Sequence, residues 1–61
     1  GKDHPSTAWV EVQLAEVLAE NGGRDEAVVL AKGGLMTLEK SLPEGHGRVV
    51  EAKEVVGRLG G

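Results

Sequence analysis

The stretch from Leu14 to Ala27 constrains the fold more than any other part of this 61-residue chain. At its centre is Asn21-Gly22-Gly23, whose residues tolerate the left-handed backbone conformation that ends a helix. Asp25 and Glu26 follow, and acidic residues stabilise the first turn of a helix by interacting with its dipole. The stretch therefore predicts a helical hairpin, in which a second helix packs back against the first.

Three helices are expected in all, over residues 6–21, 25–41 and 47–59. No proline or glycine lies between Ala8 and Asn21, and Asp3, Ser6 and Thr7 are candidate N-caps for the helix there. The second helix should end before Pro43, and the turn-forming residues 42–47 separate it from the third. We expect an all-α fold, an antiparallel helical hairpin plus a third helix that packs parallel to the first.

Apolar residues cover more than half of the circumference of the first helix, which predicts packing on two sides. One face carries Val10, Leu14, Val17 and Leu18, and another carries Ala8, Val12, Ala15 and Ala19. The second helix presents a seam rich in small residues, so the two helix axes can approach closely and should bury Ala15 and Ala27. That seam consists of Ala27, Ala31, Gly34, Leu35, Leu38 and Leu42.

Gly33 has no packing role in this pattern, and a glycine inside a helix costs about 1 kcal/mol relative to alanine. A kink or local fraying is therefore expected at Gly33-Gly34. In the third helix, Glu54 and Arg58 have the i,i+4 spacing of an ion pair on the solvent side. The apolar face of that helix consists of Val49, Ala52, Val56 and Leu59, with Val55 beside them.

The composition narrows the classes of function. The net charge of −3 argues against nucleic acid as a partner, because binding to its phosphates requires clusters of Lys and Arg. No apolar run approaches the roughly 20 residues that span a bilayer, and no signal-peptide pattern is present, so a cytoplasmic location is expected. Without cysteine there is no disulfide to support a single small domain, whose stability should be marginal.

A shift of 42 residues aligns the chain with itself in outline. His4-Pro5-Ser6 falls on His46-Gly47-Arg48, and Leu14-Ala15-Glu16-Val17 falls on Val56-Gly57-Arg58-Leu59. The shift places a predicted helix on a predicted helix and a turn on a turn. We interpret the chain as one complete repeat followed by the first helix of the next.

The residues of this unit resemble a tetratricopeptide (TPR) repeat. The pattern Leu14-Ala15-x-x-Leu18-x-x-Asn21-Gly22-x-x-Asp25-Glu26-Ala27 is similar to the core of that repeat. The Asp3-His4-Pro5 lead-in and the 42-residue spacing resemble the kinesin-light-chain-like variant. Small residues at Ala15, Ala27 and Gly34 match the family, whereas Leu18, Ala31 and Gly33 depart from it. The resemblance implies an α-solenoid fragment that serves as a protein–protein interaction or scaffolding module.

The resemblance also implies a binding groove along the first helix. Its lining would consist of Trp9, Val12, Gln13, Glu16 and Glu20. This stripe is apolar to acidic, so a protein or peptide partner is expected, but not the terminal carboxylate that chaperone-binding TPR domains grip. The alternative for Trp9 is that it covers the end of the core or packs on a neighbouring repeat.

No catalytic, metal or cofactor site is predicted, and an enzyme is not expected. His4 and His46 lack a metal-binding spacing, so we interpret them as residues that initiate helices, with a metal pair as the alternative. Asp3, His4 and Ser6 include the residue types of a nucleophilic site, but they crowd into a helix start where capping is their expected role. The rival function is a stand-alone acidic helical protein that acts as a homodimeric, antitoxin-like inhibitor.

Self-association of the isolated chain is expected, because one and a half repeats leave apolar surface uncovered. The residues predicted to pack across chains are Val10, Val17, Val55 or Leu59. Exchange of a helix through residues 43–47 is one route to such a dimer.

Overall fold

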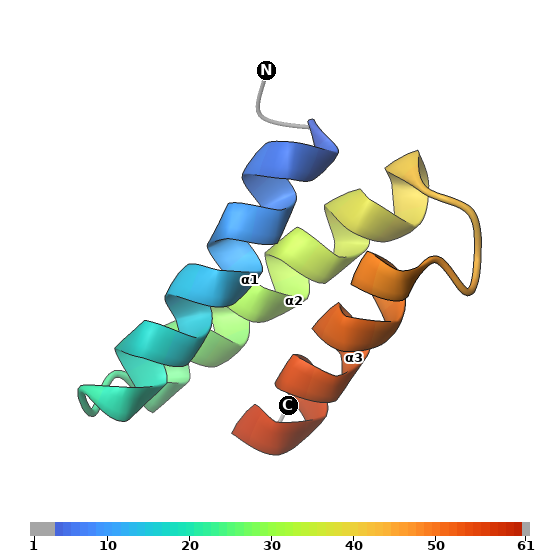
Figure 1. The fold of residues 1–61 in the computed structure, drawn as a ribbon. Coiled ribbons are helices and arrows are strands. Elements are labelled where there is room, and N and C mark those ends of the chain that lie inside the picture. Colours follow the sequence, from blue (N-terminus) through green and yellow to red (C-terminus); the bar gives the residue numbers. More distant parts are fainter. Residues whose placement is uncertain (1–3, 61) are drawn as a thin grey trace.

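In a computed structural model, residues 4–60 form three α-helices joined by two short turns (Figure 1). Helix α1 spans Pro5–Glu20, α2 spans Arg24–Ser41 and α3 spans Gly47–Leu59. The expected all-α class is confirmed, and the bounds of each helix lie within one residue of the expected ones. The three helices form a flat body whose Cα atoms extend over 32 × 23 × 13 Å.

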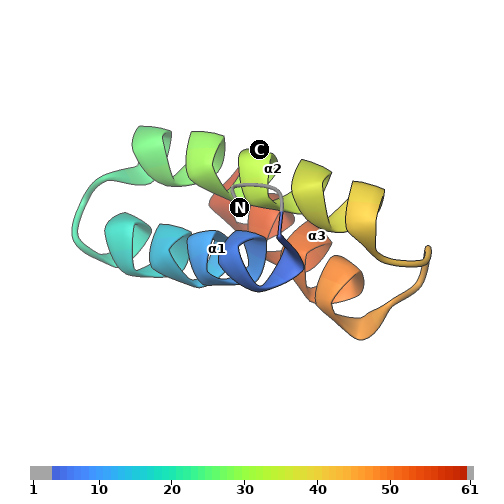
Figure 2. The same ribbon diagram turned by 90° about the horizontal axis from the view of Figure 1, so that it is seen from above.

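The turn between α1 and α2 has the conformation that its residues predict. Gly22 has φ of +90°, in the left-handed region that favours glycine. The Asn21 side-chain amide donates a hydrogen bond of 2.9 Å to the carbonyl oxygen of Val17, which satisfies an acceptor at the end of α1. Asp25 and Glu26 occupy the first turn of α2. The chain thereby reverses, and α2 runs antiparallel to α1 (Figures 1 and 2).

Small residues allow α1 and α2 to lie close together. Ala15 and Ala27 have no exposed surface, so their predicted burial is confirmed. A Cβ atom at Gly34 would lie 2.8 Å from both the carbonyl oxygen of Ala8 and Cγ2 of Val12. Only glycine fits at this approach without displacing one of the two helices.

Gly33, the next-door residue, faces open space. No atom lies within 4 Å of the position that its Cβ would occupy. Helix α2 nevertheless runs unbroken from Arg24 to Ser41, so the expected interruption at Gly33-Gly34 is absent from this helix. The packing of α2 against its two neighbours holds the helix together through both glycines.

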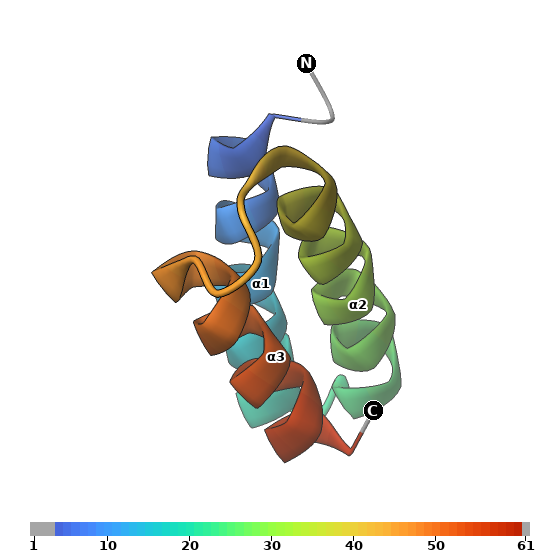
Figure 3. The same cartoon turned by 90° about the vertical axis from the view of Figure 1, so that its right-hand side faces the viewer.

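Helix α3 packs mainly on α2 and runs parallel to α1 (Figures 1 and 3). Its buried face matches the predicted one and comprises Val49, Ala52, Val55, Val56 and Leu59. Val55 is only 3% exposed and Leu59 only 8%. Both therefore pack within the chain, and the expectation that they pack across chains is wrong for this conformation. The sequence pattern could not show that α3 has its own cover in α2.

A histidine caps each of the two helices that carry the repeat. Nδ1 of His4 accepts a hydrogen bond from the backbone N–H of Ser6, and Nδ1 of His46 accepts one from that of Arg48, both at 3.1 Å. The candidate caps Ser6 and Thr7 lie inside α1 instead, and Asp3 lies outside the described residues. His4 and His46 are 42 residues apart, so the two positions match both in sequence and in the geometry of their caps.

Candidate functional site

Three of the five predicted site residues, Trp9, Glu16 and Glu20, lie on the side of α1 that faces α3. Trp9, Gln13, Glu16 and Glu20 are spaced i, i+4, i+7 and i+11, which places them along one side of a helix. Gln13 and Glu20 are exposed, whereas Trp9 and Glu16 are half-buried. Because α3 runs beside this stripe, the two parallel helices together form one continuous face (Figure 3).

Val12, the fifth predicted residue, belongs to the core. Its side chain has no exposed surface and meets α2 at Gly34. The prediction that Val12 lines a binding surface is therefore wrong. Three residues correspond to about 300° of rotation around a helix, so Val12 is turned about 60° away from Trp9. That rotation carries it from the α3 side to the face that α2 covers.

The indole of Trp9 is held between the core and an arginine of α3. The guanidinium carbon of Arg48 lies 4.7 Å from the centroid of the ring. This distance allows a cation–π attraction, worth about 0.5–1 kcal/mol at exposed sites. The ring also packs against the buried core residues. These contacts favour the packing role for Trp9 over a free recognition anchor, since the ring already has partners within the chain.

Arg58 links α3 to α1 through Glu16. The Nη2 and Oε2 atoms of the two side chains lie 3.0 Å apart. Arg58 thus pairs with Glu16 across the two helices. The sequence spacing suggested a pair with Glu54 along α3 instead, and the described residues 4–60 do not form that pair. An exposed ion pair adds only about 0–1 kcal/mol to stability. Its main consequence is to hold two charged side chains in place on the α1–α3 face.

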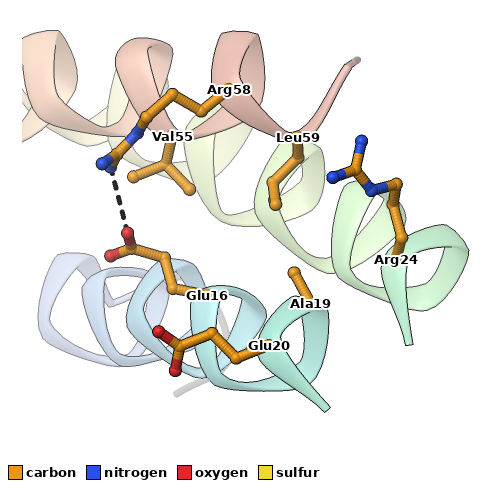
Figure 4. A pocket seen from close by; sticks show the side chains of 7 residues that line it. All are labelled: Glu16, Ala19, Glu20, Arg24, Val55, Arg58 and Leu59. Atoms are coloured by element: carbon orange, nitrogen blue, oxygen red, sulfur yellow. Dashed lines mark hydrogen bonds and ion pairs between the residues drawn. The ribbon is translucent and has the colours of Figure 1, made fainter. Parts of the chain in front are cut away.

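An open cavity of about 240 Å³ lies beside this ion pair, near the C-terminal ends of α1 and α3 (Figure 4). Ala19, Val55 and Leu59 form its apolar lining. Its charged lining consists of Glu16, Glu20, Arg24 and Arg58. Arg58 and Glu16 neutralise each other, whereas Glu20 and Arg24 make no ion pair within residues 4–60. The cavity therefore offers one carboxylate and one guanidinium around an apolar floor.

Three arginines of this face were not among the predicted site residues. Arg24 comes from the first turn of α2, and Arg48 and Arg58 come from α3. Because of these arginines, the α1–α3 face carries both positive and negative charge. The residues of the first helix alone predicted a surface that is apolar to acidic. Arg58 is equivalent to Glu16 in the 42-residue repeat, and parallel copies of a helix bring equivalent positions side by side. That equivalence is a sequence signal for the Arg58–Glu16 pair. The sequence contains no comparable signal for the positions of Arg24 and Arg48.

Comparisons of the chain with protein-family models, with curated proteins and with solved structures find no match. Among residues 4–60, no group of three or more His, Asp or Glu side chains is placed to hold a metal ion. Over the same residues, every helix is too short or too polar to cross a bilayer. What the α1–α3 face can bind follows from its own side chains.

Proposed function

We propose that this chain is a unit of a TPR-like helical array and serves protein–protein interaction or scaffolding. The observation that carries the proposal is that α1 and α3 bury different faces. The two helices start at equivalent histidines, 42 residues apart, yet each buries the face that the other leaves exposed. A helix with two packing faces is what the stacking of repeats requires, because each unit contacts a neighbour on either side.

The face that α3 buries is uncovered on α1. Val10, Leu14 and Val17 are 59%, 49% and 50% exposed. Their equivalents on α3 are Ala52, Val56 and Leu59, all of which are buried. Because α3 packs mainly on α2, the matching stripe on α1 is suited to a helix of the same kind as α2.

The face that α1 buries is uncovered on α3. Ala8, Val12 and Ala15 have no exposed surface, and their equivalents on α3 are the exposed residues Val50, Glu54 and Gly57. Gly57 is as suitable as Ala15 for close packing, and no atom lies within 4 Å of the position of its Cβ. Helix α3 therefore has room for a closely packed helix of its own. The two uncovered faces support the stacking of one neighbouring unit on each side.

In such an array the α1–α3 face becomes part of a continuous groove. Glu20 and Arg24, which make no ion pair within residues 4–60, flank the apolar floor of the cavity. Charge complementarity at an interface contributes chiefly to partner choice and orientation. The arrangement supports a protein or peptide partner that inserts an apolar side chain and carries a basic and an acidic residue on either side of it.

A tandem chain tests the array. It consists of residues 1–46 followed directly by residues 5–61, so that a second copy of α1 takes the place of α3. We expect the tandem chain to unfold in one cooperative transition with a higher Tm than the original chain, measured by circular dichroism, because each new interface adds stability. A separate transition at the original temperature, or a loss of helix per residue, would contradict the proposal.

Leu14→Lys provides the matched control for this experiment. In the original chain Leu14 is exposed, so the substitution should change the free energy of unfolding by no more than about 0.5 kcal/mol. In the second copy of the tandem chain, Leu14 lies at the new junction. The same substitution there should therefore remove most of the gain in Tm. Equal effects at both places would mean that the junction does not form.

The partner can be sought through the fluorescence of Trp9, because the chain contains no other aromatic residue. A library of peptides is titrated, and peptides that shift the emission are tested against Glu20→Gln and Arg24→Gln. We expect both substitutions to weaken binding, while Lys40→Gln near the far end of α2 leaves it unchanged. Binding that is insensitive to both cavity substitutions would show that the groove is not the site.

A further inference from the structure

The outward face of α1 has the pattern of a helix–helix seam. Thr7, Val10, Leu14, Val17 and Asn21 follow one another at intervals of 3, 4, 3 and 4 residues, which is the a/d spacing of a heptad repeat. All five are exposed. Large apolar residues occupy the centre of this seam and polar residues occupy its two ends. We refer to these five residues as the α1 seam.

No charged residue lies within the α1 seam. Of the residues beside it, Ser6 and Gln13 are exposed and uncharged, whereas Glu11 and Glu20 are acidic and flank the face on its two sides. An uncharged face of this extent on the surface of a helix is characteristic of an interaction site. It contrasts with the mixed charge of the α1–α3 face.

The other exposed apolar residues of the chain do not form such a seam. Val29 and Met36 of α2 are 73% and 57% exposed, but Asp25, Lys32 and Lys40 share their side of the helix. Val29 lines an apolar pocket with Leu18 and Leu30, but the acidic residues Asp25 and Glu26 line the same pocket. The outer side of α2 therefore lacks the uncharged heptad pattern that α1 carries.

We propose that a second copy of this chain covers the α1 seam, with the two α1 helices antiparallel about a two-fold axis at Leu14. The seam is self-complementary in this arrangement. Leu14 meets Leu14 of the partner subunit, Val10 meets the partner's Val17, and the polar Thr7 meets the partner's Asn21. An isologous contact needs this self-matching, because both copies use the same patch.

The residues on either side of the seam also match in the antiparallel arrangement. In an antiparallel pair, e positions face e positions and g positions face g positions. Glu11 then lies across from the partner's Leu18, and Glu20 lies across from the partner's Ser6. Gln13 faces its own equivalent. Two chains that each carry a net charge of −3 can therefore meet on this face without opposing like charges.

The proposed dimer requires only the exposed α1 seam and does not depend on the proposed array. In an array, only the first unit would keep the α1 seam uncovered, and pairing there would join two arrays. Helix α1 has 16 residues and is therefore about 24 Å long, at 1.5 Å per residue. A contact along one helix of this length buries less area than a standard interface, which buries roughly 800 Å² per partner. We therefore expect weak association, with a dissociation constant on the order of 100 μM.

Sedimentation equilibrium from about 10 μM to about 1 mM tests the dimer, because this range brackets the expected dissociation constant. The unaltered chain should shift from monomer to dimer, Leu14→Lys should remain monomeric, and Met36→Lys on the outer side of α2 should still dimerise. Circular dichroism establishes that each variant is folded. A folded, unaltered chain that stays monomeric at the highest concentration overturns the proposal, as does a dimer that is lost in Met36→Lys but kept in Leu14→Lys.

Cysteine cross-linking tests the antiparallel arrangement, and the chain has no cysteine to interfere. Under mild oxidation, Leu14→Cys should form a disulfide-linked dimer. Val10→Cys should cross-link poorly with itself but efficiently when it is mixed with Val17→Cys. Efficient cross-linking of Val10→Cys with itself, and not with Val17→Cys, would mean a parallel pair and would overturn the proposed arrangement.

Discussion

Gly33 and Gly34 are neighbours in α2, but their surroundings differ completely. A Cβ at Gly34 would enter the contact with α1, where the carbonyl oxygen of Ala8 and Cγ2 of Val12 each lie 2.8 Å from its position. A Cβ at Gly33 would meet nothing within 4 Å. The cost of helical glycine applies at both residues, but only Gly34 offsets this cost by allowing close packing.

Substitution of each glycine by alanine should have opposite effects on stability. Gly33→Ala should raise the free energy of unfolding by about 0.5–1 kcal/mol, because alanine loses less backbone entropy in a helix. Gly34→Ala should lower it by about 1–3 kcal/mol, because α1 must move to accommodate the methyl group. Urea unfolding followed by circular dichroism measures both. A loss of stability in Gly33→Ala would reveal a close contact on the outer side of α2.

The histidine caps make a second prediction at this scale. His46→Ala removes the acceptor for the backbone N–H of Arg48 and should lower stability by about 1 kcal/mol. His46→Asp supplies another acceptor and a negative charge at the N-terminal end of α3, so it should preserve or raise stability. Urea unfolding of both variants at neutral pH provides the comparison. Equal losses in the two variants would show that the imidazole contributes something other than the cap.

At the scale of elements, α1 and α2 are held together by the small side chains between them. Ala15, Ala27 and Ala31 have no exposed surface, which leaves no space for a larger residue at the contact. Helix α3 uses larger residues, mainly valines, against α2. The difference accounts for the closer association of the hairpin and the greater sensitivity that we expect there.

Ala27→Leu should therefore destabilise the chain by about 1–3 kcal/mol, because it forces three additional carbons into a packed contact. Val29→Leu on the same helix provides the control, since Val29 is 73% exposed and its substitution should be nearly neutral. Thermal unfolding of the two variants measures the difference. An unchanged Tm for Ala27→Leu would contradict the close approach of α1 and α2.

At the scale of the whole molecule, the three helices share one small core. Leu38 and Val12 are the largest side chains with no exposed surface in residues 4–60. A chain of 61 residues buries only about 60% of the surface that its unfolded form exposes, so its total stability is small. The loss of one central side chain is then comparable with the stability of the entire fold.

Leu38→Ala should remove most of the helix signal at 25 °C, because deletion of a buried leucine costs about 2–5 kcal/mol. Leu38→Met keeps a similar volume, should cost less than about 1.5 kcal/mol and should remain folded. Circular dichroism at a concentration below the expected dimer range separates this effect from association. A folded Leu38→Ala variant with an unchanged Tm would place the main core elsewhere.

Local interactions made much of this architecture predictable. The helix bounds, the reversal at Gly22, and the requirement for a small residue at Gly34 were all predicted from residue types and spacing. Each depends on groups a few residues apart, or on the periodicity of a single helix. The buried face of α3 was predictable for the same reason.

Contacts between helices decided the rest. The amino-acid sequence alone determined which residues form helices, where the chain turns and which faces are apolar, because these depend on backbone hydrogen bonds and on helical periodicity. Only the tertiary structure decided that Val12 is covered by α2, that Arg58 pairs with Glu16, and that the α1 seam is left without cover. Each outcome depends on the rotation of one helix about its axis relative to another. A rotation of about 60° is enough to move a side chain from a groove into the core, and periodicity within one helix does not specify it.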